Sequence, residues 1–223
     1  MDIFDAMKHR HSVRAYSDRR IEDDIVKKLN KRIAEINSKS GLNIQLVTED
    51  PEAFGGMIAH YGGFSGVRNY IALIAKKGAE WEEKIGYYGE MLTLEAEMLD
   101  LNTCWVAMSY SKGKAAGKTK IAKGEKLHIA LTLGYGAVSG KPHKSKPIDA
   151  VAEYSGDAPL WFREGIKAAL LAHTAMNQQK FKFVLSGNTV KAIAGRGFYT
   201  AIDLGIVKYH FELGAGKENF SWD

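Results

Sequence analysis

The sequence WEEKIGYYGEMLTLEAEMLDLN, residues 81–102, says most about how this chain folds. Its apolar side chains recur every three or four positions, which is the spacing of an α-helix. They are Ile85, Tyr88, Met91, Leu92, Leu94, Met98 and Leu99. Because they surround the helix on nearly all sides, and helices of that kind are buried, the stretch predicts a central helix on which the rest of the protein packs.

Shorter elements are predicted on either side of this helix. Before it and just after it, periodicity predicts helices over 1–8 and 21–37, strands over 43–50, 69–77 and 127–136, and a loop over 103–109. In the last third it predicts a helix over 161–173, a β-hairpin of 181–185 and 190–194 around Gly187, and a helix over 202–216. The glycine-rich residues 54–67 predict a loop, in which Tyr61 or Phe64 could stack on a planar ligand.

The composition is that of a globular protein. Hydrophobic residues make up 45% of the 223 residues, and 31 Lys and Arg against 26 Asp and Glu give a mixed surface of net charge +5. A single cysteine, Cys104, excludes a disulfide framework, and the seven histidines show no metal-ligand spacing. No signal sequence or apolar run of membrane length is visible. We expect a cytoplasmic protein with no metal and no nucleic-acid or membrane partner.

The segment RHSVRAY, residues 10–16, is the strongest candidate for a binding site. If the chain is extended there, alternate side chains share a face, so Arg10, Ser12 and Arg14 can converge on one anion. Arginine offers charged paired donors and serine a neutral one, which suits a phosphate monoester. Taken alone, the same residues also fit a solvated basic turn. Lys144 and Lys146 repeat the pattern around Ser145.

The chain also matches itself weakly at two places. Residues around Asn43 and Gln45 align with those around Asn177 and Gln179, an offset of 134. The helix that begins near 86–88 aligns with the one near 197–199, an offset of 111. These matches favour a fused pseudo-dimer, in which the last third of the chain imitates the second subunit of an ancestral homodimer.

Four stretches in this order resemble the FMN-dependent nitroreductase family, and more closely its fused two-repeat branch, the TM nitroreductases. They are RHSVRAY at 10–16, the helix and turn at 86–108, LGYG at 133–136 followed by the 144–147 segment, and HTAMNQQKF at 173–181. The last is similar to the family's Pro-Ser-x-x-Asn-x-Gln-Pro-Trp segment. Here His173-Thr174 stands in place of Pro-Ser, and Lys180-Phe181 in place of Pro-Trp.

The resemblance implies an α+β nitroreductase-like fold, with a central, mostly antiparallel sheet flanked by helices and an intrachain pseudo-dimer of two repeats. Residues 1–150 would be the core that supplies the phosphate and ribityl contacts. Residues 151–223 would be a second, degenerate repeat that packs on the core and contributes to the flavin site. One FMN would bind per chain, between residues 10–14 and Asn177. The chain would be a monomeric pseudo-dimer or a homodimer.

The resemblance also implies an NAD(P)H-dependent FMN oxidoreductase that passes electrons to nitro, quinone or similar small-molecule acceptors. Arg10, Ser12, Lys144 and Lys146 would bind the phosphate, Arg14 would stabilise the reduced flavin, and the turn at 103–106 would place an N–H near N5. No acid–base residue is required. The full set of implied flavin contacts is Arg10, His11, Ser12, Arg14, Thr103, Trp105, Lys144, Lys146, His173, Thr174, Ala175, Asn177 and Gln179.

Two other functions are compatible with the sequence. A flavin-binding sensor or storage protein could have the same fold without turnover, because a fold does not fix a function. A nucleic-acid-binding domain could use the lysines at 112–126, although this segment lacks interleaved aromatic residues.

Overall fold

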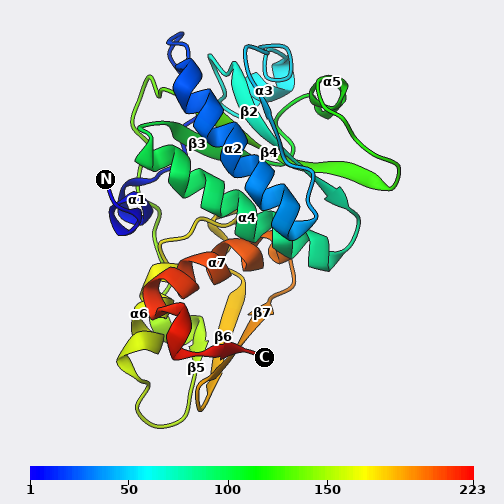
Figure 1. Cartoon of the computed structure of the whole chain (residues 1–223). Helices are drawn as coiled ribbons and strands as arrows, with labels where there is room; N and C mark the ends of the chain where they lie inside the picture. The colour runs from blue at the N-terminus through cyan, green and yellow to red at the C-terminus, as the bar shows by residue number, and fades with distance from the viewer. The chain divides into compact units, whose positions relative to one another are not determined.

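The computed structural model describes all residues from Met1 to Asp223, and they form two compact units. Unit 1 consists of residues 1–81 and 92–142, and unit 2 consists of residues 82–91 and 143–223. Helix α4 (Ala79–Met98) supplies residues to both units (Figure 1). The helix predicted in the middle of the sequence is confirmed. Helices and strands occur in both units, so the α+β class is confirmed as well.

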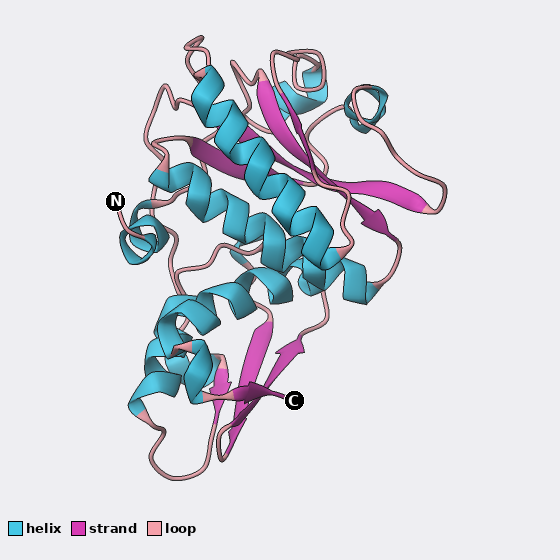
Figure 2. Ribbon diagram, viewed as in Figure 1, coloured by secondary structure: helices cyan, strands magenta, loops and turns pink.

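Unit 1 is built on an antiparallel sheet of strand order β1-β2-β4-β3 (Figure 2). Its elements besides α4 are α1 (Ile3–His9), α2 (Asp23–Ser40), β1 (Gln45–Val47), α3 (Met57–Tyr61), β2 (Asn69–Lys76), β3 (Asn102–Val106), α5 (Lys112–Gly117) and β4 (Glu125–Gly134). The predicted loop over 103–109 is wrong in its first half, because residues 102–106 pair with β4 from Gly134 to Ala130. The apolar run there is a buried strand that directly follows the helix.

The buried strand β2 has a core on each of its faces. Tyr70, Ala72 and Ile74 belong to one cluster with Phe54 and Phe64. The residues between them, Ile71 and Leu73, are also fully buried and lie on the other face, because side chains alternate along a strand. Both faces are therefore covered, which explains why the run is apolar throughout.

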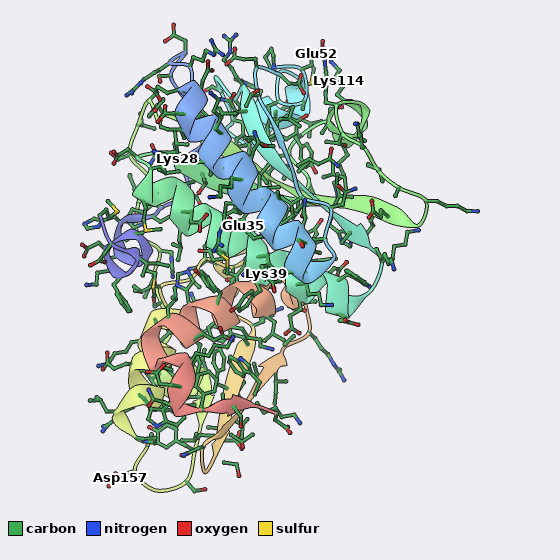
Figure 3. The ribbon with its side chains drawn as sticks, in the orientation of Figure 1. Lys28, Glu35, Lys39, Glu52, Lys114 and Asp157 are labelled. Carbon is green, nitrogen blue, oxygen red and sulfur yellow. The ribbon has the colours of Figure 1, made fainter.

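Helix α2 crosses one face of the sheet in unit 1 (Figure 1). Its apolar stripe is buried, whereas Lys28, Glu35 and Lys39 lie on its exposed side (Figure 3). The helix ends at Gly41, which adopts a left-handed conformation with φ 73°. Arg32 joins α2 to the unit 1 part of α4 by an ion pair of 2.6 Å with Glu95.

Unit 2 contains a second, mixed sheet of strand order β5-β6-β7-β8. Its elements are η1 (Ile148–Ala150), β5 (Ala152–Glu153), α6 (Leu160–Ala169), η2 (Ala175–Asn177), β6 (Phe181–Ser186), β7 (Thr189–Ala194), α7 (Thr200–Ala215), η3 (Lys217–Asn219) and β8 (Ser221–Trp222). The predicted hairpin is confirmed as β6 and β7, with Gly187 at φ 60° in its turn. The pairs β5–β6 and β7–β8 are parallel.

The core of unit 2 is largely aromatic. The Phe211 ring stacks on Phe183, with 4.6 Å between the centroids, and meets Phe162 and Phe220 edge to face. Large rings in these geometries contribute both buried area and specific pairing energy. They allow a small unit with a four-stranded sheet and two helices to form its own core.

Two glycines let helices approach closely in unit 2. A Cβ atom on Gly86 of α4 would lie 1.9 Å from the Ile202 carbonyl oxygen, and one on Gly205 of α7 would lie 1.9 Å from that of Glu83. Gly86 thus faces the main chain of α7 at Ile202, and Gly205 faces the main chain of α4 at Glu83. The contact is reciprocal. It relates Gly86 to Gly205, and not to Gly197 as in the sequence alignment at offset 111.

None of the helices is both long enough and apolar enough to cross a lipid bilayer.

Candidate functional site

The predicted binding segment, residues 10–16, lies along the edge strand β3 of unit 1. Ser12 forms a bridge with Thr103, and the Val13 amide donates a hydrogen bond of 3.0 Å to the Thr103 carbonyl. The chain leaves α1 in an extended conformation at Arg10. The fold thus brings together Ser12 and Thr103, two predicted flavin contacts that are distant in the sequence.

Tyr16 anchors the end of this segment in the core. Its hydroxyl donates to the Val13 carbonyl over 2.7 Å and lies 2.6 Å from the Thr132 hydroxyl. Burial raises the pKa of Tyr16 far above its usual range, with the Thr132 hydrogen bond acting weakly in the opposite direction. Tyr16 is therefore neutral and holds the segment in place by packing and hydrogen bonding.

Arg14 presents an exposed guanidinium in unit 1. Its Cζ atom lies 5.9 Å from the centre of the Phe64 ring, a long cation–π contact. No hydrogen bond or ion pair joins its side chain to another residue. Phe64 itself is buried and pairs edge to face with Phe54, whereas Tyr61 is 84% exposed.

Arg10 differs from Arg14, because it is buried. Burial raises the pKa of the nearby Glu97 carboxyl, while the charge of Arg10 and, less strongly, of His9 lowers it. The positive charge of Arg10 therefore lies close to a buried carboxyl group. Of the two arginines in the predicted binding segment, Arg14 is the one that faces solvent.

The β3 residues beside this segment carry one unusual polar atom. The Thr103 hydroxyl oxygen is buried and has no hydrogen-bond partner. Burying a hydroxyl without a partner costs free energy, so such groups are rare in folded proteins. Trp105 is half-buried, and burial raises the pKa of the Cys104 thiol, which keeps this group protonated.

His11 packs against a glycine that the sequence did not single out. A Cβ atom on Gly140 would lie 2.5 Å from the His11 Cβ atom and 3.0 Å from the Ser12 carbonyl oxygen. A larger residue at 140 would displace segment 10–16. Gly140 therefore belongs to the structure that supports this segment.

In unit 2 the predicted contacts form a hydrogen-bonded cluster. Asn177 Nδ2 and Gln179 Nε2 both donate to the Lys144 carbonyl, over 3.0 and 2.8 Å. Gln179 Oε1 accepts from the Lys146 amide over 2.8 Å. The Lys146 ammonium donates to the carbonyls of Gln178 and Gln179. The ammonium of Lys144 is exposed and has no hydrogen-bond or ion-pair partner.

The segment 174–179 has left-handed backbone at three residues and is bonded to the buried carboxyl group of Asp203. Met176, Asn177 and Gln179 have φ values of 52°, 51° and 45°, which are costly for residues other than glycine. Asp203 Oδ1 accepts from the Ala175 amide over 2.9 Å. Burial raises the pKa of Asp203 to about 6, although this hydrogen bond lowers it. Thr174 is buried and its hydroxyl accepts from the Gln179 amide.

A buried acid–base pair in unit 2 was not found from the sequence. Glu90 of α4 and His210 of α7 are both fully buried, with 2.9 Å between Glu90 Oε1 and His210 Nε2. His173, a predicted flavin contact, lies 3.8 Å from Glu90 Oε2. The available signal was that Glu90 stands between the apolar stretches of the helix predicted to be buried, whereas the other glutamates lie nearer its ends. No group of three or more His, Cys, Asp or Glu residues is placed to bind a metal ion.

The chemistry of unit 1 favours an anionic ligand. Ser12 bridges Thr103 of β3, and Arg14, two residues further along the same segment, carries an exposed guanidinium with no hydrogen-bond or ion-pair partner. Hydroxyl and guanidinium donors are the groups that bind phosphate and other oxyanions.

Comparison with solved structures supports the same fold over almost the whole chain. A "putative nitroreductase" from Thermotoga maritima is 21% identical, with a TM-score of 0.68 over 98% of this chain and 85% of that one. An FMN-dependent nitroreductase from Clostridium difficile is 20% identical, with a TM-score of 0.51 over 62% and 90%. A "putative nitroreductase" from Desulfovibrio desulfuricans, solved in complex with FMN, is 18% identical, with a TM-score of 0.53 over 68% and 95%.

These likenesses confirm the nitroreductase-like α+β fold predicted from the sequence. No curated protein matches the chain. A family model described as "Putative TM nitroreductase" matches residues 2–215. Because that match extends over nearly all of the 223 residues, the protein belongs to the TM nitroreductase family.

Proposed function

We propose that this protein is an FMN-dependent oxidoreductase that takes electrons from NAD(P)H and passes them to nitro, quinone or similar small-molecule acceptors. Membership of the TM nitroreductase family supports this reaction class. FMN is the flavin named for the Clostridium difficile and Desulfovibrio desulfuricans proteins of the same fold. The observation that carries the proposal is the bridge between Ser12 and Thr103, two predicted flavin contacts, with the exposed, unpaired Arg14 guanidinium two residues after Ser12.

The residues of unit 1 fit the groups of FMN. Ser12, with Arg10 and His11 beside it, would bind the phosphate and ribityl oxygens. Arg14 would bind near the edge of the flavin ring, where a cation stabilises the negative charge of the reduced form. Thr103 and Trp105 would line the same region. The bound flavin supplies the redox chemistry, and the protein supplies binding, orientation and charge.

Unit 2 contains the remaining flavin contacts that the resemblance implies. The sequence assigns them to Lys144, Lys146, His173, Thr174, Ala175, Asn177 and Gln179. Within this set, the Lys144 ammonium has no partner, whereas the side chains of Lys146, Asn177 and Gln179 hydrogen-bond to the protein main chain. We therefore assign phosphate binding first to Lys144 and an indirect contribution to the others.

An internal repeat is part of the same proposal. The hydrogen bonds of Asn43 and Gln45 in unit 1 resemble those of Asn177 and Gln179 in unit 2, and each pair fastens the main chain of a lysine segment. The reciprocal glycine contact of α4 and α7 also has the character of a local two-fold axis. The first observation supports a fused pseudo-dimer, whereas the glycine contact pairs residues at another offset than the sequence alignment. We propose that this pseudo-dimer functions as a cytoplasmic monomer or homodimer.

An absorption spectrum of the purified protein tests the function. We expect a flavin spectrum after addition of FMN, bleaching with NADH or NADPH under anaerobic conditions, and recovery of the spectrum with a nitroaromatic or a quinone. A bound flavin that neither nucleotide reduces would contradict the enzyme and support the flavin-binding sensor or storage protein. A protein that binds no FMN would overturn the proposal as a whole.

A further inference from the structure

Hydrogen bonds fix both the main chain and most side chains of the segment His143–Lys146 in unit 2. His143 and Ser145 both bond the Leu170 carbonyl, over 3.0 and 2.9 Å. The Lys144 carbonyl and the Lys146 amide are bonded to side-chain amides, as described above. Of the four side chains in this segment, that of Lys144 alone makes no hydrogen bond or ion pair.

We infer that Gln179 is a positioning residue: it fixes the main chain of Lys144 and Lys146, so that the Lys144 ammonium is held ready for a phosphate group. Gln179 is 3% exposed, and its amide makes three hydrogen bonds. Nε2 donates to the Lys144 carbonyl and to Asn177 Oδ1, and Oε1 accepts from the Lys146 amide. This inference rests on the proposed binding of FMN.

The conformation around Gln179 supports a role in placing other groups. Met176, Asn177 and Gln179 all adopt left-handed backbone, a strained arrangement that persists when the surroundings enforce it. Asp203 enforces it here, because its carboxylate accepts from the Ala175 amide and from Gln178 Nε2 over 2.7 Å. Asp203 of α7 thus holds Ala175 and Gln178, the residues that flank Met176 and Asn177.

The two lysines of the segment have different roles in this arrangement. The Lys146 ammonium donates to the carbonyls of Gln178 and Gln179, both over 2.9 Å. The Lys146 side chain therefore stabilises the hydrogen-bonded cluster around Gln179. The Lys144 side chain keeps all its donors for a ligand. A flexible lysine loses conformational entropy when it binds a ligand. Because the main chain of Lys144 is already fixed, only the side chain has to be ordered, and the entropic cost of binding is smaller.

Unit 1 contains a matched control. Gln45 Nε2 donates to the Lys120 carbonyl over 2.7 Å and to Asn43 Oδ1 over 2.9 Å, and Gln45 Oε1 accepts from the Lys120 amide over 2.9 Å. These are the same three kinds of hydrogen bond that Gln179 makes. None of the predicted flavin contacts belongs to this first cluster. Loss of the Gln45 amide should therefore disturb the main chain locally without changing phosphate binding.

The test compares the affinities of the protein for FMN and for riboflavin, which lacks the phosphate. Both dissociation constants are measured by flavin fluorescence for the wild type, Lys144→Met, Gln179→Met, the double variant and Gln45→Met. We expect Lys144→Met and Gln179→Met to weaken FMN binding roughly tenfold to hundredfold, the effect of one charged hydrogen bond. Riboflavin affinity and the FMN affinity of Gln45→Met should not change.

The double variant separates positioning from a direct contact. If Gln179 acts through Lys144, its substitution has no further effect once the lysine is gone, so the double variant should bind FMN like Lys144→Met. Additive losses would overturn the inference, as would an equal loss of FMN and riboflavin affinity in Gln179→Met. An unchanged FMN affinity in Lys144→Met would also overturn it. A wild type that binds neither flavin would instead contradict the proposed function.

A second variant covers the case in which Gln179→Met does not fold. Asn177→Gly removes the exposed partner amide that also donates to the Lys144 carbonyl, and glycine adopts the left-handed backbone at 177 without strain. We expect a smaller, phosphate-specific loss of FMN affinity, with riboflavin binding unchanged. An FMN affinity equal to that of the wild type in this variant would contradict the inference.

Discussion

His210 Nε2 lies 2.9 Å from Glu90 Oε1, and neither side chain is exposed to solvent. The other ring nitrogen of His210 lies 3.1 Å from the Ala168 carbonyl, which can only accept a hydrogen bond. His210 must donate there, so one proton remains for the contact between Nε2 and the Glu90 carboxyl group. The two side chains therefore form a buried pair that links α4 to α7 inside unit 2.

Glu90→Ala should destabilise the protein by about 3–5 kcal/mol, because removing one member of a buried pair leaves the other without its partner. Urea unfolding monitored by circular dichroism measures this loss. Glu153→Ala is the control, since it removes one member of an exposed pair with Lys182 and should cost less than about 1 kcal/mol. Equal effects of the two substitutions would contradict a structural role for the buried pair.

Asp203 should make the stability of the protein depend on pH. Burial raises its pKa from 3.8 to about 6, so between these values the folded protein binds a proton that the unfolded chain has released. Its contribution to stability is therefore greatest below pH 4 and is lost as the pH rises through 6, by roughly 3 kcal/mol.

The measurement for Asp203 is the free energy of unfolding of the wild type and of Asp203→Asn at pH 4 and pH 7. Asparagine does not titrate, so the difference between the two proteins should shift by this amount over that range, with the wild type relatively more stable at pH 4. A difference that stays constant with pH would show that the pKa of Asp203 is not raised.

Gly205→Ala should destabilise unit 2 by about 1–3 kcal/mol or more. The new methyl group would lie 1.9 Å from the Glu83 carbonyl oxygen and 2.6 Å from the Tyr87 nitrogen, so the two helices would have to move apart. Gly113→Ala is the control, because nothing lies within 4 Å of a Cβ at this position of α5. Alanine there should leave stability unchanged or raise it by a few tenths of a kcal/mol. The melting temperatures of Gly205→Ala and Gly113→Ala, measured by thermal unfolding, test this difference in stability.

Arg14→Met should weaken FMN binding about tenfold or more and leave the stability of the apoprotein unchanged. Its exposed guanidinium makes no hydrogen bond or ion pair in the protein, so its removal affects only the ligand. Flavin fluorescence titration together with a melting curve measures both effects. Arg196→Met, a substitution of another exposed arginine, should change neither. An unaltered FMN affinity in Arg14→Met would contradict the proposed site.

Arg10→Ala should affect both binding and folding. The loss of a charged hydrogen bond to the phosphate should cost about 1.5–3 kcal/mol of FMN affinity. The substitution also removes the charge that lowers the pKa of buried Glu97, so the apoprotein should be less stable above the pKa of that carboxyl. Adding Glu97→Gln should restore part of the stability but none of the affinity. Full FMN affinity in Arg10→Ala would disprove the assignment of this residue to the phosphate.

Much of the local structure followed from spacing alone. The central helix and the strands β2 and β4 are long apolar runs that are buried on most sides, and the hairpin of β6 and β7 has alternating apolar residues around a Gly turn. The strand β3 was predicted as a loop, because a short apolar run directly after a helix carries no periodicity of its own. Pairing with β4 makes it a strand, and that pairing is a property of the tertiary fold.

The candidate site likewise has features that the sequence predicted and features that depend on the tertiary fold. The sequence singled out Arg14 and Lys144, and both carry cations without partners in the folded protein. Spacing alone did not distinguish the exposure of Arg10 from that of Arg14, yet Arg10 is buried near Glu97 and Arg14 is exposed. Exposure depends on which elements pack over a residue, and these elements come from other parts of the chain.

The amino-acid sequence by itself determined the central helix and the residue types that suit a phosphate, because these depend on periodicity and on side-chain chemistry. Its resemblance to a known family in four stretches implied the α+β fold. Only the tertiary structure decided that Gln179 fastens Lys144, that Glu90 meets His210 and that Gly86 faces the main chain of α7. Each of these contacts joins residues distant in the chain. Their distances are set by the packing of whole helices and strands, which no local pattern records.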